Sequence, residues 1–510
     1  MSAKQLRRGR WHLLLLAAIV LLGGWLRFSR LDLMEFKGDE WRLHRLAVSH
    51  AQGDLQLHGI MSSVHVWNPP MSVYLYAIPA SVSPDPIGLA CLTALLNTLA
   101  VGLTYWLARQ WLPRGPSLVV ALLFAVSPWA VLESRKIWAQ QLLPFFTISF
   151  FLGAVGWLRK RRLRDMALMA VSLAVMSQLH YSSLALWPIV LWLAWKRRSS
   201  REWRAWALGA LVFILLWTPF LIHLGKTRFE ELTQQEVGQA VSQGPVVELV
   251  KGLRWEARTM GHGGFEDVLG APADRSDDAL RTGDRLTLVL ALLLAAGMAV
   301  AISRLRRQPE LWLLLLWFFL PPLLLSPLHK IELHYVIVTW PANFLFVGLL
   351  VDEAAGRIRA QGGRRAHAAV LILALAGLGT LVLEEAVFSR KFLDVVSQNG
   401  GTMGDYGITY RDKLRVARYL KETVLSGPFS LLDYTNPFPS PDTYACLYQT
   451  AGGQGIPLCP AGKSFPPGPI FAVLGPFARL DADPKLFRQV RGVALGPLRV
   501  ETFLPLRAYR

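Results

Sequence analysis

The sequence predicts an α-helical polytopic membrane protein with about 11 transmembrane helices and a small extracytoplasmic α/β domain at its C-terminal end. Three observations predict this class. Hydrophobic residues make up 53% of the 510 residues and occur in blocks, which approach the roughly 20 apolar residues needed to cross a bilayer. Short basic clusters separate these blocks, and residues 388–510 contain no further block of that length.

The basic clusters carry the net charge of +19 and set the predicted topology. They follow the positive-inside pattern, in which Lys and Arg collect in cytosolic loops. Residues 1–10 are therefore expected in the cytosol. No small-residue cleavage site follows the first apolar segment, so this segment is expected to be a retained helix rather than a signal peptide. Charge that is distributed between apolar segments does not predict nucleic-acid binding.

Eleven apolar segments predict the helices, and the flanking charges agree with their alternating direction. The helices are expected over about 11–28, 87–108, 117–132, 137–158, 166–179, 182–195, 205–223, 285–303, 310–326, 335–351 and 367–387. They form a transmembrane domain over residues 1–387 with long external loops at 29–85 and 224–284, and they leave the C-terminus outside. Within the first loop, residues 71–80 are apolar but too short to span, so this stretch is expected to lie half-embedded.

Residues 388–510 are expected to form the extracytoplasmic α/β domain. Their periodicity predicts an amphipathic helix over 411–423 and short buried strands over 429–432 and 470–474. Cys446 and Cys459 either form a disulfide in an oxidising compartment or remain free thiols, and the sequence leaves both possibilities open. The chain contains neither a CxxC nor an HExxH motif, so no metal or other cofactor is predicted.

An acidic pair, Asp39 and Glu40, follows Gly38 in the first external loop. A carboxylate at the membrane surface beside a glycine that lets the backbone turn is a candidate general base. The alternative is a solvated loop that contains two acids. Residues 41–47 space their apolar side chains as on a helix that lies along a bilayer, and the Pro69-Pro70 pair ends this region.

Cations occur at the same predicted depth in two other external turns. Arg135 and Lys136 lie in one turn, and Lys330 and His334 lie in the other. Such cations either extend to lipid head groups or point into a cavity and hold an anion. His180, at the tip of a helical hairpin, is a weaker candidate, because a histidine there is more often hydrogen-bonded structure than a catalyst.

Four motifs resemble a known family: GDEWRLHRLAVSHAQGDL, NPPMSVYLYAIP, SRKIWAQQLLPFF and HYVIVTWPA. Together they resemble the GT-C glycosyltransferases, in particular the bacterial relatives of the protein O-mannosyltransferases and of the lipid A aminoarabinose transferases. The resemblance extends over residues 10–350 in order and topology. It implies the GT-C type of fold and a location in a bacterial cytoplasmic membrane, with a cytosolic N-terminus.

The resemblance also implies the reaction and its partners. A polyprenyl-phosphate-linked sugar would enter from the membrane lipids, and an acceptor glycan, lipid or protein would arrive from outside. The resemblance implies Asp39, with its neighbour Glu40, as catalytic residues and Arg135 at the donor phosphate. The charge and position of the external turns add Lys136, Lys330 and His334 as candidates at the phosphate, and the candidate substrate-binding residues are Asn68, His180 and Tyr335. Asn68 replaces the lysine of the aminoarabinose transferases, and Gln140 replaces an aspartate of the mannosyltransferases, which indicates a different donor or acceptor.

The residue types suit this chemistry. An acceptor hydroxyl is a weak nucleophile, so a carboxylate that removes its proton would assist attack on the anomeric carbon. The leaving phosphate requires positive charge, and one direct displacement predicts inversion. Two other functions remain open from the sequence: a transporter or flippase, and a ligase of lipid-linked glycans. Glu332 and His334 could also contribute to a metal site, although no motif requires one.

Overall fold

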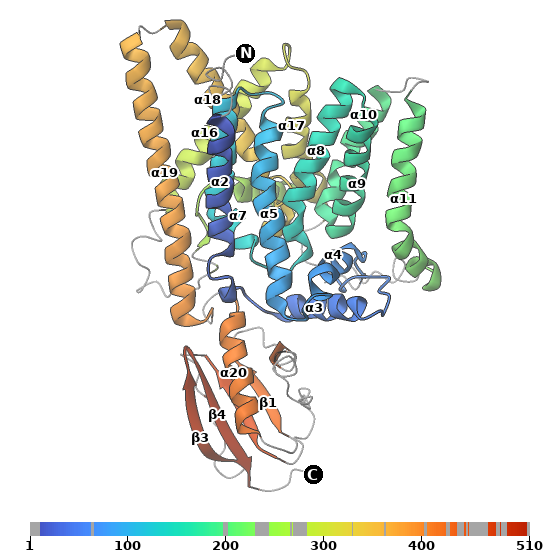
Figure 1. Cartoon of the computed structure of the whole chain (residues 1–510), viewed down its shortest axis with the longest axis vertical. Coiled ribbons are helices and arrows are strands. Elements are labelled where there is room, and N and C mark those ends of the chain that lie inside the picture. Colours follow the sequence, from blue (N-terminus) through green and yellow to red (C-terminus); the bar gives the residue numbers. More distant parts are fainter. Residues whose placement is uncertain are drawn as a thin grey trace.

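The computed structural model has a helical bundle with a smaller domain at one end (Figure 1). It describes residues 11–62, 66–196, 202–229, 244–265, 268, 283–328, 330–361, 364–401, 405–424, 429–435, 443–444, 447, 468–475, 480 and 487–506. Cys446, Cys459 and much of the loop 224–284 lie outside these residues. The two alternatives for the cysteines therefore stay as the sequence leaves them.

Helices lie at all eleven ranges that the apolar segments predict. The bundle consists of α2 (Trp11–Phe28), α5 (Pro86–Ala108), α6 (Arg114–Val126), α7 (Pro128–Glu133), α8 (Leu143–Lys160), α9 (Leu163–Leu179), α10 (Trp187–Lys196), α11 (Trp203–Lys226), α16 (Gly283–Arg304), α17 (Leu311–Leu325), α18 (Trp340–Gln361) and α19 (Arg364–Asn399). Among the described residues, 6 helices are long and apolar enough to cross a membrane. Spanning by the shorter helices stays a prediction.

Two helices of the loop 29–85, which the sequence predicts to be external, lie across the end of the bundle rather than along it (Figure 1). They are α3 (Gly38–Ala51) and α4 (Met71–Ala80), which pack against each other. The buried side of α3 includes Leu43 and Ala47, whereas Arg42 and Arg45 on its other side are exposed. This division is that of an amphipathic helix packed on the protein by its apolar side. The short apolar segment 71–80 is α4, which is only 10 residues long.

The predicted helix over 117–132 is interrupted at Pro128, which begins α7. Proline has no N–H to donate, so carbonyls one turn earlier lose their helical partner. The buried Arg27 of α2 supplies replacements, since its guanidinium donates to the carbonyl oxygens of Phe124 at 3.2 Å and Ala125 at 2.8 Å. The break at Pro128 thus explains why Arg27 is buried in the neighbouring helix α2.

The last bundle helix, α19, is longer than predicted, with 36 residues. It continues without interruption through the expected domain boundary at residues 387 and 388 and ends at Asn399. At 1.5 Å per residue its length is about 54 Å, which exceeds the thickness of a bilayer core. In Figure 1 it runs along the whole edge of the bundle toward the smaller domain.

The smaller domain combines one helix with a four-stranded sheet of order β1-β2-β4-β3. Its elements are α20 (Tyr410–Thr423), β1 (Ser430–Tyr434), β2 (Ile470–Leu474), β3 (Phe487–Leu495) and β4 (Leu498–Pro505). The helix and the first two strands lie where the sequence predicts them. β1 and β2 pair in parallel, and β4 pairs antiparallel to both β2 and β3.

Candidate active site

The acidic pair forms the first turn of α3, where the helix dipole favours negative charge. The two carboxylates have different surroundings. The Asp39 side chain is 46% exposed, and its Oδ1 is 3.2 Å from Nη1 of Arg42. Glu40 is only 4% exposed, and its Oε2 accepts the backbone N–H of Lys37 at 3.1 Å. Asp39 is therefore the accessible acid, and Glu40 caps the helix.

Burial changes the acidity of Glu40. Loss of solvent, followed by the nearby negative charge of Glu35, raises the pKa of Glu40 to about 7. This carboxyl group therefore changes its charge close to neutral pH. A group that titrates near the working pH beside an accessible carboxylate is typical of an acid–base site.

Four charged side chains beside the acidic pair form what we call the ion cluster: Glu35, Lys37, Glu133 and Lys136. Glu35 is 2% exposed and joins both lysines, with its carboxylate oxygens 2.7 Å from Nζ of Lys37 and 2.9 Å from Nζ of Lys136. Nζ of Lys136 is also 3.1 Å from Glu133. The segment before α3 and the turn after α7 thus meet in one buried network.

Opposite charges shift two members of the cluster toward their charged forms. Burial alone would lower the pKa of Lys136, but Glu133 and Glu35 together raise it above its ordinary value. Burial would likewise raise the pKa of Glu35, but Lys136 and Lys37 lower it overall. Burial raises the pKa of Glu133 in spite of Lys136. Lys136 is therefore a cation at neutral pH that can contribute to an anion site.

Arg135 faces a different direction from Lys136. It is 1% exposed, and its terminal nitrogens donate to the backbone carbonyl oxygens of Leu26, Arg27, Ser29 and Arg30. Carbonyls at a helix end lack intrahelical partners, so Arg135 caps the end of α2. The resemblance implied a contact of Arg135 with the donor phosphate, but this geometry commits its guanidinium to the bundle.

Four aromatic rings lie together at the end of the bundle that contains Lys136. We call Trp138, His180, His334 and Tyr335 the ring cluster. Ring centroids are 5.2 Å apart for His334 and Trp138, and 4.5 Å apart for His334 and Tyr335. Nδ1 of His180 accepts the backbone N–H of Ser182 at 3.2 Å, so the neutral His180 ring carries its proton on Nε2.

The structure corrects one expectation for this cluster. Burial lowers the pKa of His334 to about 4, so its imidazole is neutral at physiological pH. His334 therefore cannot supply positive charge to a leaving phosphate, although a neutral imidazole N–H remains a hydrogen-bond donor.

Two further candidates have structural partners of their own. Lys330 is half-exposed, and its Nζ is 2.8 Å from Glu332, which also pairs with Lys251 of α13 (Pro245–Arg258) at 3.0 Å. Asn68 donates through its side-chain amide to the carbonyl oxygen of Ile60 at 2.9 Å. Asn68 thus holds together the turn before the Pro-Pro pair.

The structure brings Glu40 and His334 close to Lys136, places Asp39 beside Glu40 on the exposed side of the first turn of α3, and leaves Lys330 in an ion pair with Glu332. Sequence reasoning missed Glu35, Lys37 and Glu133. Glu35 and Lys37 are separated by the buried Phe36, and alternation of charged and apolar residues in an extended stretch was the available signal. Within the part of the chain that the structure describes, no three His, Cys, Asp or Glu residues are grouped to hold a metal ion.

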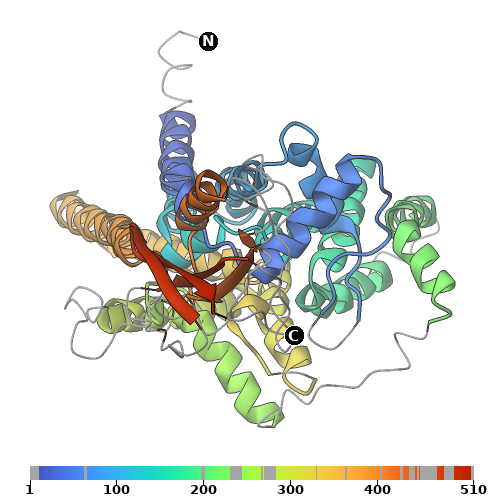
Figure 2. The ribbon, with the colours of Figure 1, turned by 90° about the horizontal axis from the view of Figure 1, so that it is seen from below.

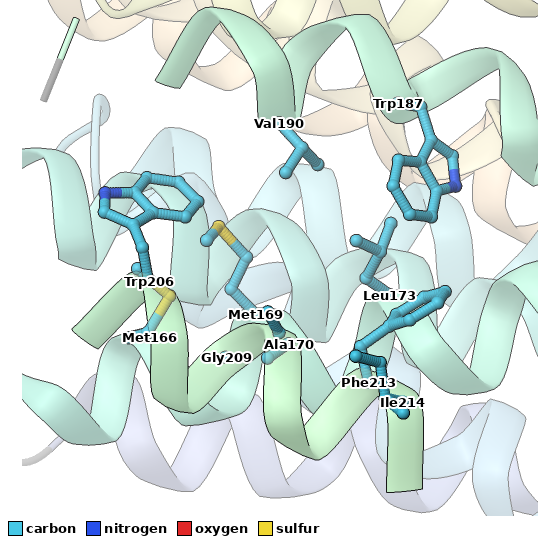
Figure 3. A pocket seen from close by; sticks show the side chains of 11 residues that line it. Met166, Met169, Ala170, Leu173, Trp187, Val190, Trp206, Gly209, Phe213 and Ile214 are labelled. Atoms are coloured by element: carbon cyan, nitrogen blue, oxygen red, sulfur yellow. The ribbon is translucent and has the colours of Figure 1, made fainter. Parts of the chain in front are cut away.

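Apolar hollows occur inside the bundle, away from these polar groups. One, with a volume of about 200 Å³, lies between α9, α10 and α11 and is lined by side chains such as Met169, Trp187 and Phe213 (Figure 3). A larger one, of about 680 Å³, lies between α2, α6, α18 and α19. Neither hollow is lined by an acidic or basic side chain.

The arrangement of the helical bundle belongs to a known class: the chain has the GT-C fold of membrane glycosyltransferases. In particular, it is similar to ArnT from Cupriavidus metallidurans in the apo state, with a TM-score of 0.58, 12% identity, and coverage of 97% of this chain and 98% of ArnT. ArnT bound to undecaprenyl phosphate gives a TM-score of 0.52 at 12% identity, with coverage of 96% and 98%.

A third solved structure extends the comparison to another group of enzymes. The archaeal oligosaccharyltransferase AglB from Archaeoglobus fulgidus, in complex with an inhibitory peptide and a dolichol-phosphate, gives a TM-score of 0.51 at 13% identity. That match covers 90% of this chain and 65% of AglB. No protein-family model and no curated protein sequence matches the chain.

Proposed function

We propose that this protein is a glycosyltransferase that moves a sugar from a polyprenyl-phosphate donor to an acceptor hydroxyl at the outer face of a bacterial cytoplasmic membrane. The observation that supports it most is the accessible carboxylate of Asp39 beside an ion cluster with two lysines, on a GT-C fold. Two solved structures with this fold hold undecaprenyl phosphate and dolichol-phosphate. A polyprenyl phosphate is therefore the class of carrier that we propose.

In this proposal Asp39 is the general base. Its half-exposed carboxylate is held by a single ion pair with the exposed Arg42, so an incoming hydroxyl can replace that partner. Asp39 takes the proton from the hydroxyl as its oxygen attacks the anomeric carbon and the carbon–phosphate oxygen bond breaks. Because the attack and the departure take place on opposite faces of the sugar, the product has inverted configuration. Glu40 fixes the helix turn that carries the base.

The donor phosphate is proposed to bind at Lys37 and Lys136. An ammonium group has three N–H donors. Lys136 donates toward Glu35 and Glu133, and Lys37 toward Glu35 and the carbonyl oxygen of Asp405. Each lysine thus retains one donor for a phosphate oxygen. Arg135 supports this site from behind by capping α2. Lys330, which pairs with Glu332 outside the ion cluster, stays a candidate for the same phosphate.

The ring cluster is proposed to bind sugar. Partly exposed Trp138 and Tyr335 offer apolar ring faces, and the imidazole rings of His180 and His334 offer hydrogen bonds to hydroxyl groups. Neutral donors suit a carbohydrate better than cations, because sugar hydroxyls carry no charge to compensate. Asn68 contributes by shaping the turn that precedes α4.

Asp39→Asn in the purified full-length chain tests the function. It should lower transfer of sugar from a polyprenyl-phosphate donor by about 10²–10⁴-fold, which is the usual contribution of a general base, while the Kd for undecaprenyl phosphate stays within about threefold. Asp54→Asn, an exposed acid after the end of α3, is the matched control. Transfer at a near-normal rate by Asp39→Asn would show that Asp39 is not the general base. Binding of lipid-linked glycan without any transfer by the wild type would favour a transporter.

A further inference from the structure

The backbone just before the acidic pair is bonded to the smaller domain. We call residues 33–37 the α3 linker and residues 405–413 the contact segment. In the contact segment, the hydroxyl of Tyr406 donates to the linker carbonyl oxygen of Leu33 at 2.7 Å, and the N–H of Tyr410 donates to that of Met34 at 2.8 Å. In the other direction, the linker N–H of Phe36 donates to the contact segment at 3.1 Å. Glu35 and Thr409 form an isolated antiparallel bridge between the two segments.

A buried lysine of α20 completes this set. Lys413 is 2% exposed, and its Nζ donates to the carbonyl oxygen of Phe36 at 2.8 Å and to Oγ1 of Thr443 at 2.6 Å. The ammonium also lies 5.0 Å from the ring centroid of Tyr444. A buried ammonium group is costly unless its N–H donors are used in hydrogen bonds. The bond to the carbonyl oxygen of Phe36 therefore fixes Lys413 and the linker to each other. Phe36 is three residues from Asp39.

The contact segment also fixes Lys37 of the ion cluster. Nζ of Lys37 donates to the carbonyl oxygen of Asp405. Gly407 has φ +84, and a Cβ there would be 2.2 Å from Cε of Lys37, so the lysine stem packs directly on a bare backbone. The phosphate-binding lysine and the linker therefore depend on the same nine residues.

The contact segment is anchored to the bundle as well. The hydroxyl of Tyr410 donates to Oδ1 of Asp85 at 2.9 Å, and Asp85 caps the start of α5. The view from below in Figure 2 shows α20 and the sheet next to the end of α3. Because α20 is bonded to both the linker and α5, the smaller domain sets the position of one relative to the other.

We propose that the contact segment is a built-in part of the active site, and that Lys413 is a positioning residue that holds the acidic pair at the reaction distance, while Asp405 and Gly407 hold Lys37. The kinetic consequences of this inference rest on the proposed function, whereas the hydrogen bonds that it describes do not. A displacement of about 1 Å of a catalytic group costs on the order of 10²-fold in rate. Loss of the Lys413 donors should therefore lower kcat, whereas donor binding at Lys37 and Lys136 should be little affected, because Lys37 is held by Asp405 and Gly407 rather than by Lys413.

Lys413→Met in the full-length protein is the direct test, because it keeps the stem and removes the donors. We expect kcat for transfer from the polyprenyl-phosphate donor to fall at least about tenfold, with KM for the donor within about threefold and the folded fraction unchanged after size-exclusion chromatography. Glu422→Gln, on the exposed side of the same helix, should leave kcat unchanged. Tyr406→Phe removes one hydroxyl and should lower kcat in the same direction by a smaller factor.

Hydrogen exchange separates this inference from the proposed function. Exchange of the Phe36 amide should accelerate at least about tenfold in Lys413→Met and in Tyr406→Phe, whether or not a transfer assay succeeds. If Lys413→Met does not fold, Tyr406→Phe carries the test. Unchanged exchange at residues 33–37 with wild-type kcat would overturn the inference. Loss of kcat accompanied by an equal rise in donor KM would also overturn it, because that result indicates a role in donor binding instead.

Discussion

At the scale of the residue, neighbouring acids have different roles because their surroundings differ. Asp39 is half-exposed, whereas Glu40 is buried next to Glu35. The dipeptide itself indicates only that acids are present. The burial of Glu40 comes from residues around it, and it has a measurable consequence for stability.

Glu40 should make stability depend on pH. Its pKa is raised from 4.5 to about 7 in the folded protein, so the folded state binds more protons than the unfolded state between these values. This contribution is complete below pH 4.5 and is lost as pH rises through 7, by roughly 3 kcal/mol. Glu40→Gln keeps an acceptor for the Lys37 N–H but does not titrate. Its Tm relative to the wild type should therefore rise between pH 4.5 and 7.5 in detergent micelles.

The exposed Glu422→Gln on α20 controls for the removal of one negative charge in this comparison. A difference in Tm between Glu40→Gln and wild type that stays constant from pH 4.5 to 7.5 would contradict the buried position of Glu40.

Arg135 shows why the site was only partly predictable from the sequence. The motif around it is compatible with phosphate binding, but its acceptors are carbonyls of α2, more than 100 residues earlier in the chain. No local pattern contains that information. The neutral state of His334 was missed for the same reason, because it results from burial by distant segments. By contrast, the presence of acids and cations in separate external turns followed directly from charge and topology.

At the scale of the element, the apolar segments located the helices well. They did not indicate the break at Pro128 or the extension of α19 to Asn399, which depend on partners outside those segments. The strand β3 was also missed. Most of its side chains are exposed, including Arg488 and Arg491, so it lacks the alternation of apolar and polar residues that predicts a strand.

Close packing of α16 against α18 gives a prediction at this scale. A Cβ on Gly297 of α16 would lie 2.1 Å from the carbonyl oxygen of Phe346 in α18, a distance that requires the helices to move apart. Gly297→Ala should therefore destabilise the protein by about 1–3 kcal/mol despite the higher helix propensity of alanine. Thermal unfolding in detergent measures the change.

Gly377 provides the matched control for this substitution. It lies in α19, and a Cβ added there would have nothing within 4 Å, so Gly377→Ala should be neutral or stabilise by up to about 1 kcal/mol. Equal effects of the two substitutions on Tm would show that α16 and α18 do not approach this closely.

At the scale of the whole molecule, the two ends of the bundle carry different charge arrangements. At the end opposite α3, Arg304 of α16 pairs with Asp352 at 2.8 Å and Glu353 at 2.7 Å of α18, and Arg159 of α8 pairs with Glu310. These ends are the ones that the positive-inside pattern assigns to the cytosol. Helix α3, whose first turn carries the acidic pair, lies at the other end, next to the smaller domain (Figure 1).

This polarity yields the last prediction, the side of the membrane on which Asp39 lies. If sugar is transferred from the polyprenyl carrier at the outer face, α3 and the smaller domain must lie on that side. Ser81→Cys, beside α4, should then react with a membrane-impermeant maleimide in intact spheroplasts. Ser303→Cys, near the end of α16, should react only after permeabilisation; both positions are exposed. All three native cysteines are replaced by serine in this experiment. Labelling of Ser303→Cys alone in intact spheroplasts would place the acidic pair in the cytosol and contradict a reaction at the outer face.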